Sequence, residues 1–244
     1  MRLGIMQPYF FPYLGHFALI AHTDRWVAFD VTQYTPKSWI SRNRILHPTQ
    51  GWNYISVPLS NSSISIRIHE ARVLDPAATR RSLQGKLSHY RRKAPFYDAV
   101  QAVVEESFAG ASDFLVDLNV NGLAAVCRYL GIPFHADICS RMDLDLPERT
   151  ESGLWALEIC KRMGADEYLN PIGGRELFDP AVYRANGVRL RFLQAPELRY
   201  DTGDFAFEPH LSILDAMMWN PPEALRQIVL NGSQIVAPEE TSVA

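Results

Sequence analysis

The fold of this chain is decided by the stretch from Gly4 to Asp30, GIMQPYFFPYLGHFALIAHTDRWVAFD. Its first apolar run ends before Pro8, because proline has no backbone N–H for a strand interior. Apolar side chains then recur at helical spacing over residues 14–21, and a second apolar run ends at Asp30. A strand, a helix and a strand of these lengths predict a βαβ unit, which requires a parallel sheet with a right-handed crossover.

Three polar side chains of this stretch stand where a ligand site is expected. In parallel sheets, ligands bind in the crevice at the carboxyl ends of the strands. Gln7 and Tyr9 follow the first strand, and Asp30 ends the second. We therefore expect Gln7 and Tyr9 to contact a substrate, with Asp30 as the best-placed carboxylate for removing a proton.

The rest of the chain predicts a Rossmann-like α/β fold, with a mostly parallel sheet and helices on both faces. Alternating apolar residues over 52–59 and 64–69 predict a hairpin after the first βαβ unit. Three helical patterns over about 77–131 indicate an inserted helical block, and the strand–helix alternation returns from residue 132. We expect residues 1–232 to form a single α/β domain and residues 233–244 a frayed C-terminal tail.

Composition and charge limit the classes of function. With 244 residues, 47% of them hydrophobic, the chain can bury a full core, and its formal net charge of −3 gives no reason to expect DNA binding. No apolar run approaches the ~18 residues that span a bilayer, and no signal-peptide pattern is expected at the amino terminus. An odd number of cysteines without CxxC spacing favours core thiols in a cytoplasmic protein. They are Cys127, Cys139 and Cys160.

A polar, aromatic and locally basic segment follows Asp30 and has no clear period of 2 or 3.6. Long irregular segments in a compact domain often carry function. This one is either a solvated loop or a lid that presents cations to a phosphate or carboxylate, and the sequence leaves both open. As a lid it would offer cations, a neutral donor and a stacking surface. These are Lys37, Arg42 and Arg44, then Asn43, then Trp39.

A second anion site is predicted at Gly173-Gly174, which follows a strand and precedes a helix. The same glycines also permit a tight turn without any ligand. The chain has neither GxGxxG nor GxxxxGK[ST], and no histidine spacing indicates a zinc site. Near the carboxyl terminus we expect His210 to bind substrate and Ser212 to cap a helix rather than to join a triad.

Five motifs in order make the chain resemble the WbqC-like proteins over residues 1 to about 230. They are MQPYFFPYLGHFALI with Asp24, Val27 and Asp30 after it, KSWISRNRI at Lys37 to Ile45, KAPFY at Lys93 to Tyr97, GADEYL at Gly164 to Leu169, and HLSILD at His210 to Asp215. The resemblance implies an enzyme that attaches an amino acid or other acyl group, glycine among the options, to an amino sugar or similar amine. The pathways it implies are surface-polysaccharide, O-antigen and natural-product biosynthesis.

Three hypotheses about function follow. In the first, a transferase forms the amide with Asp30 as base and with Asn43 and Arg44 stabilising charge, and a carrier protein or aminoacyl-tRNA delivers the acyl group. No cofactor is firmly implied, and the oligomeric state stays open. The second is an ATP- and Mg²⁺-dependent adenylate-forming ligase or nucleotidyltransferase-like enzyme that uses His16, Lys37 and the Gly173-Gly174 turn for the phosphates. The third is a non-catalytic binding protein of a glycan-assembly complex. Convergence of Asp30, Arg42 and Arg44 in a pocket would favour an enzyme, and their spread over an open surface would favour the binder.

Overall fold

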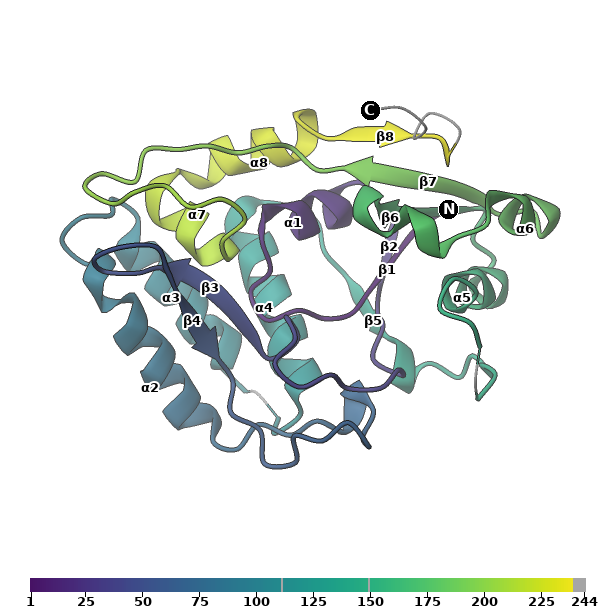
Figure 1. Cartoon of the computed structure of the whole chain (residues 1–244), viewed down its shortest axis with the longest axis horizontal. Helices are drawn as coiled ribbons and strands as arrows, with labels where there is room; N and C mark the ends of the chain where they lie inside the picture. Colours follow the sequence, from purple (N-terminus) through teal and green to yellow (C-terminus); the bar gives the residue numbers. More distant parts are fainter. Residues whose placement is uncertain (111, 149, 239–244) are drawn as a thin grey trace.

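The computed structural model describes residues 1–110, 112–148 and 150–238, which contain a six-stranded sheet flanked by helices (Figure 1). The sheet order is β5-β2-β1-β6-β7-β8, and every neighbouring pair is parallel except β7 and β8. The strands are β1 (Arg2–Met6), β2 (Arg25–Ala28), β5 (Ala136–Ile138), β6 (Glu167–Pro171), β7 (Arg189–Gln194) and β8 (Gln234–Val236). The predicted Rossmann-like α/β fold is confirmed.

The order of the sheet strands locates the crevice where such a fold binds ligands. Counted in chain order, the strands run 3-2-1-4-5-6, the order of doubly wound dinucleotide-binding sheets. The chain builds outward from β1 through β2 to β5 and then returns to β6 on the other side of β1. The topological switch point therefore lies between β1 and β6, outside their carboxyl ends.

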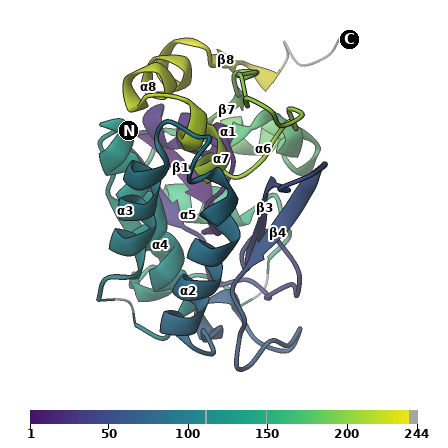
Figure 2. The same ribbon diagram turned by 90° about the vertical axis from the view of Figure 1, so that its left-hand side faces the viewer.

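Helices cover both faces of the sheet and enclose two apolar cores. They are α1 (Leu14–Ala21), α2 (Pro76–Leu87), α3 (Tyr97–Phe108), α4 (Leu115–Leu130), α5 (Trp155–Met163), α6 (Pro180–Ala185), α7 (Ile213–Trp219) and α8 (Pro222–Asn231). Successive residues of β6 face opposite sides, because Leu169 packs into the core with α1, α4 and α8 whereas Tyr168 packs with α5 and α6. The helical block expected over about 77–131 consists of α2, α3 and α4, which Figure 2 shows as a layer on one side of the molecule.

The expected hairpin is present, but its two strands differ from those predicted. It pairs β3 (Arg42–Leu46) with β4 (Trp52–Ser56) in antiparallel register, and residues 64–69 form no strand. The prediction missed β3 because one of its inward-facing residues is polar: Asn43 is buried beside the equally buried Ile45, so hydrophobicity alone shows no alternation. Ile64, read from its spacing as a strand residue, is 64% exposed.

The C-terminal segment contains one more element than expected. Residues 234–236 were expected to belong to a frayed tail, but they form β8, which pairs with β7 and completes the sheet edge. Ile235 and Val236 pack into the two cores on opposite faces, which explains why a three-residue strand is held there. Residues 239–244 of that expected tail lie outside the described part of the chain.

Two findings bear on the compartment predictions. None of the helices in the described ranges combines the length and apolar character that crossing a bilayer requires. The prediction that the cysteines are core thiols is confirmed, because Cys127, Cys139 and Cys160 are all buried and unpaired with one another. Burial raises the pKa of each thiol, so all three stay protonated at neutral pH.

Candidate functional site

The carboxyl edge of the sheet gathers the segments that follow four parallel strands (Figure 1). The segment from Gln7 to Tyr13 follows β1, and Asp30 follows β2. The short 3-10 turn η3 (Cys139–Arg141) follows β5, and the 3-10 helix η4 (Ile172–Leu177) follows β6. The sequence-predicted residues Gln7, Asp30 and Gly173-Gly174 therefore share one edge of the sheet.

Two buried asparagines hold the segment after β1 by its carbonyl oxygens. Asn119 of α4 donates from Nδ2 to the carbonyl of Pro8 at 2.7 Å. Asn43 of β3 donates from Nδ2 to the carbonyls of Phe10 and Phe11 at 3.1 and 2.8 Å, and its Oδ1 accepts from the next backbone N–H at 2.8 Å. The amide of Asn43, which the sequence placed in catalysis, is thus engaged in shaping this turn.

A third buried side chain holds the turn at its most strained residue. Phe11 has φ +40°, a left-handed conformation that costs a non-glycine residue roughly 1–2 kcal/mol. Ser212 donates from Oγ to the Phe11 carbonyl at 2.7 Å, which adds to the bond from Asn43. Charge-neutral hydrogen bonds of this kind are each worth about 1 kcal/mol, so together they offset the strain. The turn is therefore built in advance with one fixed shape.

The loop after Asp30 lies against this turn, as the sequence predicts for a lid or wall. The backbone N–H of Phe10 donates to the carbonyl of Trp39 at 2.9 Å, and Asn119 also donates to the carbonyl of Ile40 at 2.8 Å. Gln7 donates from Nε2 to the hydroxyl of Thr32 at 3.4 Å. The loop thus has its backbone bonded to the site, which a purely solvated loop does not require.

Tyr9, which follows the first strand, packs against the buried His16 of α1. Tyr9 is half-buried, with its ring centroid 5.6 Å from that of His16, and burial followed by the neighbouring Tyr13 raises its pKa. His16 is 3% exposed, packs 5.0 Å from the Trp26 ring and has no hydrogen-bond partner for Nε2. Burial lowers the pKa of His16 to about 3, so the imidazole is neutral at physiological pH.

Asp30 is fully buried, and its carboxylate is bound to the loop after β5. Oδ1 accepts the Ser140 backbone N–H at 2.8 Å, and Oδ2 accepts the Ser140 hydroxyl at 2.6 Å. The backbone carbonyl of Asp30 accepts the His69 backbone N–H at 3.0 Å, and the ring Nδ1 of His69 lies 3.2 Å from the same oxygen. Ser140 is exposed and stands on the solvent side of the pair. Sequence reasoning missed Ser140 because nothing in one chain's pattern relates it to Asp30, 110 residues away.

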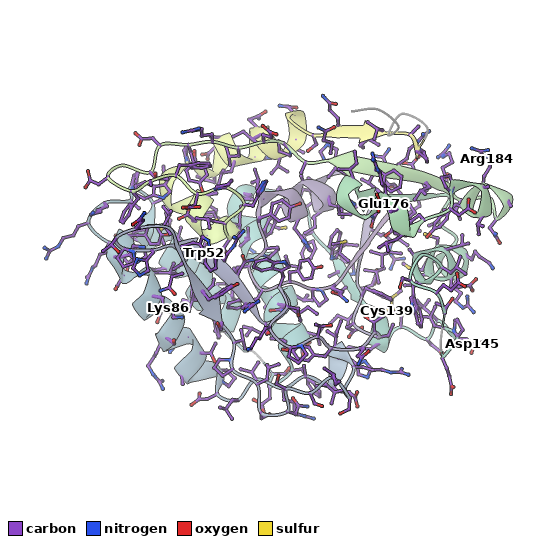
Figure 3. The ribbon with its side chains drawn as sticks, in the orientation of Figure 1. Trp52, Lys86, Cys139, Asp145, Glu176 and Arg184 are labelled. Carbon is purple, nitrogen blue, oxygen red and sulfur yellow. The ribbon has the colours of Figure 1, made fainter. Side chains whose placement is uncertain are left out.

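The arginines predicted to meet an anion lie on the outer face of the hairpin. The Arg42 guanidinium lies 4.3 Å from the centroid of the Tyr54 ring. The Arg44 guanidinium lies 5.4 Å from the Trp39 ring and 5.1 Å from the Trp52 ring. No recorded contact joins these arginines to Asp30, and in Figure 3 the labelled Trp52 stands well apart from Cys139, the residue before Ser140. The structure therefore does not bring together the predicted base and the predicted cations.

Two further predicted residues adopt left-handed backbone. Lys37 is exposed with φ +58°, and His210 is exposed with φ +55°. The ring of His210 lies 6.0 Å from that of Tyr13, edge to face, and its carbonyl accepts Arg44 Nη2 at 3.5 Å. His210 therefore stands beside the hairpin arginine, whereas Lys37 makes no recorded contact with an aromatic ring or carboxylate in the described ranges.

No triad is formed around His210, as expected. Ser212 caps α7 by accepting the Leu214 N–H at 3.3 Å, so the capping prediction is confirmed. The carboxylate of Asp215 is fully buried and accepts the hydroxyls of Tyr90 and Tyr200, each at 2.5 Å. Burial raises the pKa of Asp215, and the hydrogen bonds from the two tyrosines oppose that rise.

Gly173 and Gly174 lie in η4 rather than at the start of an α-helix. The next α-helix begins only at Pro180, so the expected free amides of an α-helical terminus are not offered there. A Cβ on Gly174 would lie 2.6 Å from Nδ2 of the buried Asn170, whereas one on Gly173 would meet no atom within 4 Å. A side chain at position 174 would therefore displace the Asn170 amide, and this close packing favours the tight-turn alternative.

Two cavities in the described ranges lie away from this edge of the sheet. One of about 340 Å³ is lined by α6 and β7, and one of about 270 Å³ lies at the amino ends of β1, β6 and β7. The second is bordered by groups that pair with one another, among them Arg2 with Glu167 and Arg189 with Asp166. Neither is lined by a predicted site residue, and the switch-point edge remains the site favoured by the fold.

Comparison with known proteins places these motifs in a family. The WbqC-like protein family matches residues 7–227, which include the turn after β1, the β3–β4 hairpin and Ser212, the residue that caps α7. The chain is 27% identical to the uncharacterized protein Rv1507c of Mycobacterium tuberculosis over 218 residues, covering 88% of this chain and 92% of that protein. No solved structure matches the chain. From the family match over most of its length, the chain belongs to the WbqC-like protein family.

Proposed function

We propose that the protein is a transferase that joins an aminoacyl or other acyl group to the amine of an amino sugar or similar acceptor. The observation that carries this proposal is the turn after β1, which three buried side chains hold in a strained shape at the switch point of the sheet. Strained and over-determined backbone is concentrated at functional sites, because it fixes side chains for binding or reaction. Here it fixes Gln7 and Tyr9.

Asp30 and Ser140 at this edge of the sheet can remove the protons that the acceptor loses when the amide forms. An amine acceptor arrives as an ammonium and has to lose protons before and during its attack on the acyl carbon. Asp30 is buried behind Ser140, so the proton moves from the ammonium to the Ser140 oxygen while the Ser140 proton moves to the carboxylate across 2.6 Å. Asp30 remains the base of the proposal, with Ser140 as its contact to the acceptor. One ammonium proton is released to solvent before attack. As the amide C–N bond forms, the bond from the acyl carbon to the carrier thiol or tRNA hydroxyl breaks, and the proton held by Asp30 returns through Ser140 to that leaving sulfur or oxygen.

In this proposal, neutral hydrogen-bond donors stabilise the negative charge that develops on the acyl oxygen during attack. The side-chain amide of Gln7 and the phenol of Tyr9 follow β1, and the raised pKa of Tyr9 keeps that phenol protonated as a donor. The donor substrate is an acyl group on a carrier protein or a tRNA. Arg42 and Arg44 stand on the outer face of the hairpin and are assigned to binding rather than to the reacting atoms.

The same position of Arg42 and Arg44 favours a second candidate, a non-catalytic binding protein of a glycan-assembly complex. Their guanidiniums lie against aromatic rings on the hairpin and do not converge with Asp30. The ATP-dependent alternative is less well supported, because the neutral, fully buried His16 supplies no positive charge to a phosphate.

The test is an assay for new amide product by mass spectrometry. Purified protein is incubated with amino-sugar nucleotides as acceptors and with glycyl-tRNA or glycyl carrier-protein thioesters as donors. Product that depends on Asp30 and Ser140, and that survives in the matched surface variant Ser63→Ala, supports the transferase. An acceptor that binds in calorimetry but gives no product with either donor class supports the binding protein instead.

A further inference from the structure

The outer face of the hairpin carries a continuous row of aromatic rings and guanidinium groups. The register pairs Arg42 with Ser56 and Arg44 with Tyr54, so both arginines share a face with the aromatic residues of β4. The rings of Trp52 and Tyr54 contact each other at 4.8 Å between centroids. Arg42 lies against Tyr54 at one end of the row, and Arg44 lies against Trp52 and Trp39 at the other.

Both arginines keep unused hydrogen-bond donors. In the described part of the chain, no carboxylate lies within ion-pairing distance of either guanidinium. The Nε atoms of both are buried and have no hydrogen-bond partner. The recorded side-chain bond of Arg44 is a long one of 3.5 Å from Nη2 to the carbonyl of His210. Two guanidiniums without a carboxylate partner, two residues apart on one strand, are suited to an anion with two charged groups.

The aromatic members of the row are unusually exposed. Trp39 is 41% exposed and Trp52 is 39% exposed, although large indoles are mostly buried in folded proteins. An exposed aromatic face beside arginines stacks on a planar ring, and such stacking tolerates any nucleobase. The row therefore offers two kinds of contact at once, one for a ring and one for paired phosphates.

We propose that the Trp39–Arg44–Trp52–Arg42 surface binds a nucleoside diphosphate, with the base stacked on an indole and the two phosphates bound by the two guanidiniums. The occupant is argued from charge complementarity and from the exposed rings beside the charges. This inference rests on the proposed function in one respect: the amine acceptor of the transferase would carry the nucleoside diphosphate that this surface binds.

The surface is attached directly to the turn at the switch point. Asn43, between the two arginines, faces the other way and holds Phe10 and Phe11. The carbonyl of Arg44 accepts the N–H of Ser212, the residue that holds the same turn from the α7 side. A nucleoside diphosphate bound on this surface would thus lie on β3, the strand whose Asn43 holds the turn after β1.

The experiment measures binding by isothermal titration calorimetry with UDP, inorganic pyrophosphate and uridine as probes. We expect UDP to bind at least about tenfold more tightly than pyrophosphate, and uridine to bind weakly. Arg42→Gln and Arg44→Gln should each weaken UDP at least about tenfold, because each removes a charge-assisted contact. Trp52→Ala should weaken UDP about tenfold and leave pyrophosphate unchanged, because stacking involves only the base.

The matched control is Arg91→Gln, which removes the same charge from an exposed arginine with no aromatic partner in the described ranges, and it should leave UDP binding unchanged. The proposal is overturned if UDP and pyrophosphate bind equally, if Arg91→Gln weakens UDP as much as Arg44→Gln does, or if no UDP binding is detected. A single-stranded RNA tetranucleotide that binds more tightly than UDP and competes with it also overturns the proposal, in favour of an RNA end.

Failure of this inference can be told apart from failure of the proposed function. If UDP binding depends on Arg44 but no acceptor gives amide product, the nucleoside diphosphate site is supported and the proposed transferase function is contradicted. Amide product from an acceptor without a nucleotide, with KM unchanged in Arg44→Gln, keeps the transferase and removes the inference.

Discussion

Replacement of Asn43 by alanine should destabilise the protein by about 2–4 kcal/mol. The side chain is 4% exposed and makes three hydrogen bonds, two through Nδ2 and one through Oδ1. The Phe11 carbonyl keeps a donor in the variant, because Ser212 still bonds to it at 2.7 Å. The Phe10 carbonyl loses its recorded side-chain donor, and an orphaned buried polar group costs about 1–3 kcal/mol. Release of the left-handed Phe11 recovers part of the loss, which keeps the total below the sum of three bonds.

The assay is urea unfolding followed by tryptophan fluorescence, with the free energy of unfolding taken from midpoint and slope. The matched control is Asn53→Ala on β4, a half-buried asparagine in the same hairpin that makes no recorded bond to the turn, and it should change stability by less than about 0.5 kcal/mol. Asn43→Asp keeps the shape but sets a carboxyl group against two carbonyls, so it should cost at least as much as alanine. A loss below 0.5 kcal/mol in Asn43→Ala would refute the idea that this amide holds the turn.

Three other predictions address the base, the buried histidine and the η4 glycine. Asp30→Asn should lower turnover by about 10² or more, given the usual worth of a general base. Ser140→Ala should lower turnover comparably if it relays the proton, and normal turnover in Asp30→Asn would remove Asp30 from the mechanism. The pKa of His16 is about 3 in the folded protein and 6.5 in the unfolded chain. As the pH falls below 6.5 only the unfolded chain binds a proton at this group, so the folded state becomes less stable as the pH falls. Between pH 7 and pH 5 wild type should therefore lose about 2 kcal/mol more stability in urea unfolding than His16→Phe does, and parallel losses in the two proteins would contradict the assignment. Gly174→Ala should destabilise the protein by about 1–3 kcal/mol, because the added Cβ meets the Asn170 side chain. Gly173→Ala, whose Cβ meets no atom within 4 Å, should be neutral or stabilising. Equal thermal midpoints for the two variants would show that the Asn170 side chain moves aside without cost.

The sequence predicts the fold well where hydrophobicity and glycine carry the signal. The stretch from Gly4 to Asp30 specifies β1, α1 and β2 because its strands are apolar on both faces, as buried parallel strands are. Gly131 and Gly164 mark helix ends, and both adopt the left-handed conformation that ends α4 and α5. The same reasoning misses β3, whose inward residue Asn43 is buried for its hydrogen bonds rather than for its apolar surface.

The candidate site is less predictable because its contacts join residues far apart in the chain. Gln7 and Asp30 could be placed at the ligand edge from strand ends alone, and the loop after Asp30 could be expected to fold against the turn. The partner of Asp30 is Ser140, and the partner of Phe11 is Ser212, 201 residues away. No local pattern encodes such pairs, because each depends on how the finished sheet brings separate loops together.

The first loop of the sheet explains why the usual nucleotide signature is missing from this fold. In sheets of this strand order, glycines after the first strand let a pyrophosphate approach the amino terminus of the first helix. Here a Cβ on Gly15 would collide with the ring of Tyr13, so that ring already lies over the first turn of α1. The Tyr13 ring would therefore have to move before a diphosphate could approach the start of α1 at Gly15. In the site proposed above, the guanidiniums of Arg42 and Arg44, on the strand whose Asn43 holds this loop, take the place of the amides at that helix start. If the proposed diphosphate site is confirmed, recognition of an anion in this chain depends on side chains rather than on main-chain amides, and a search for a glycine fingerprint would not find it.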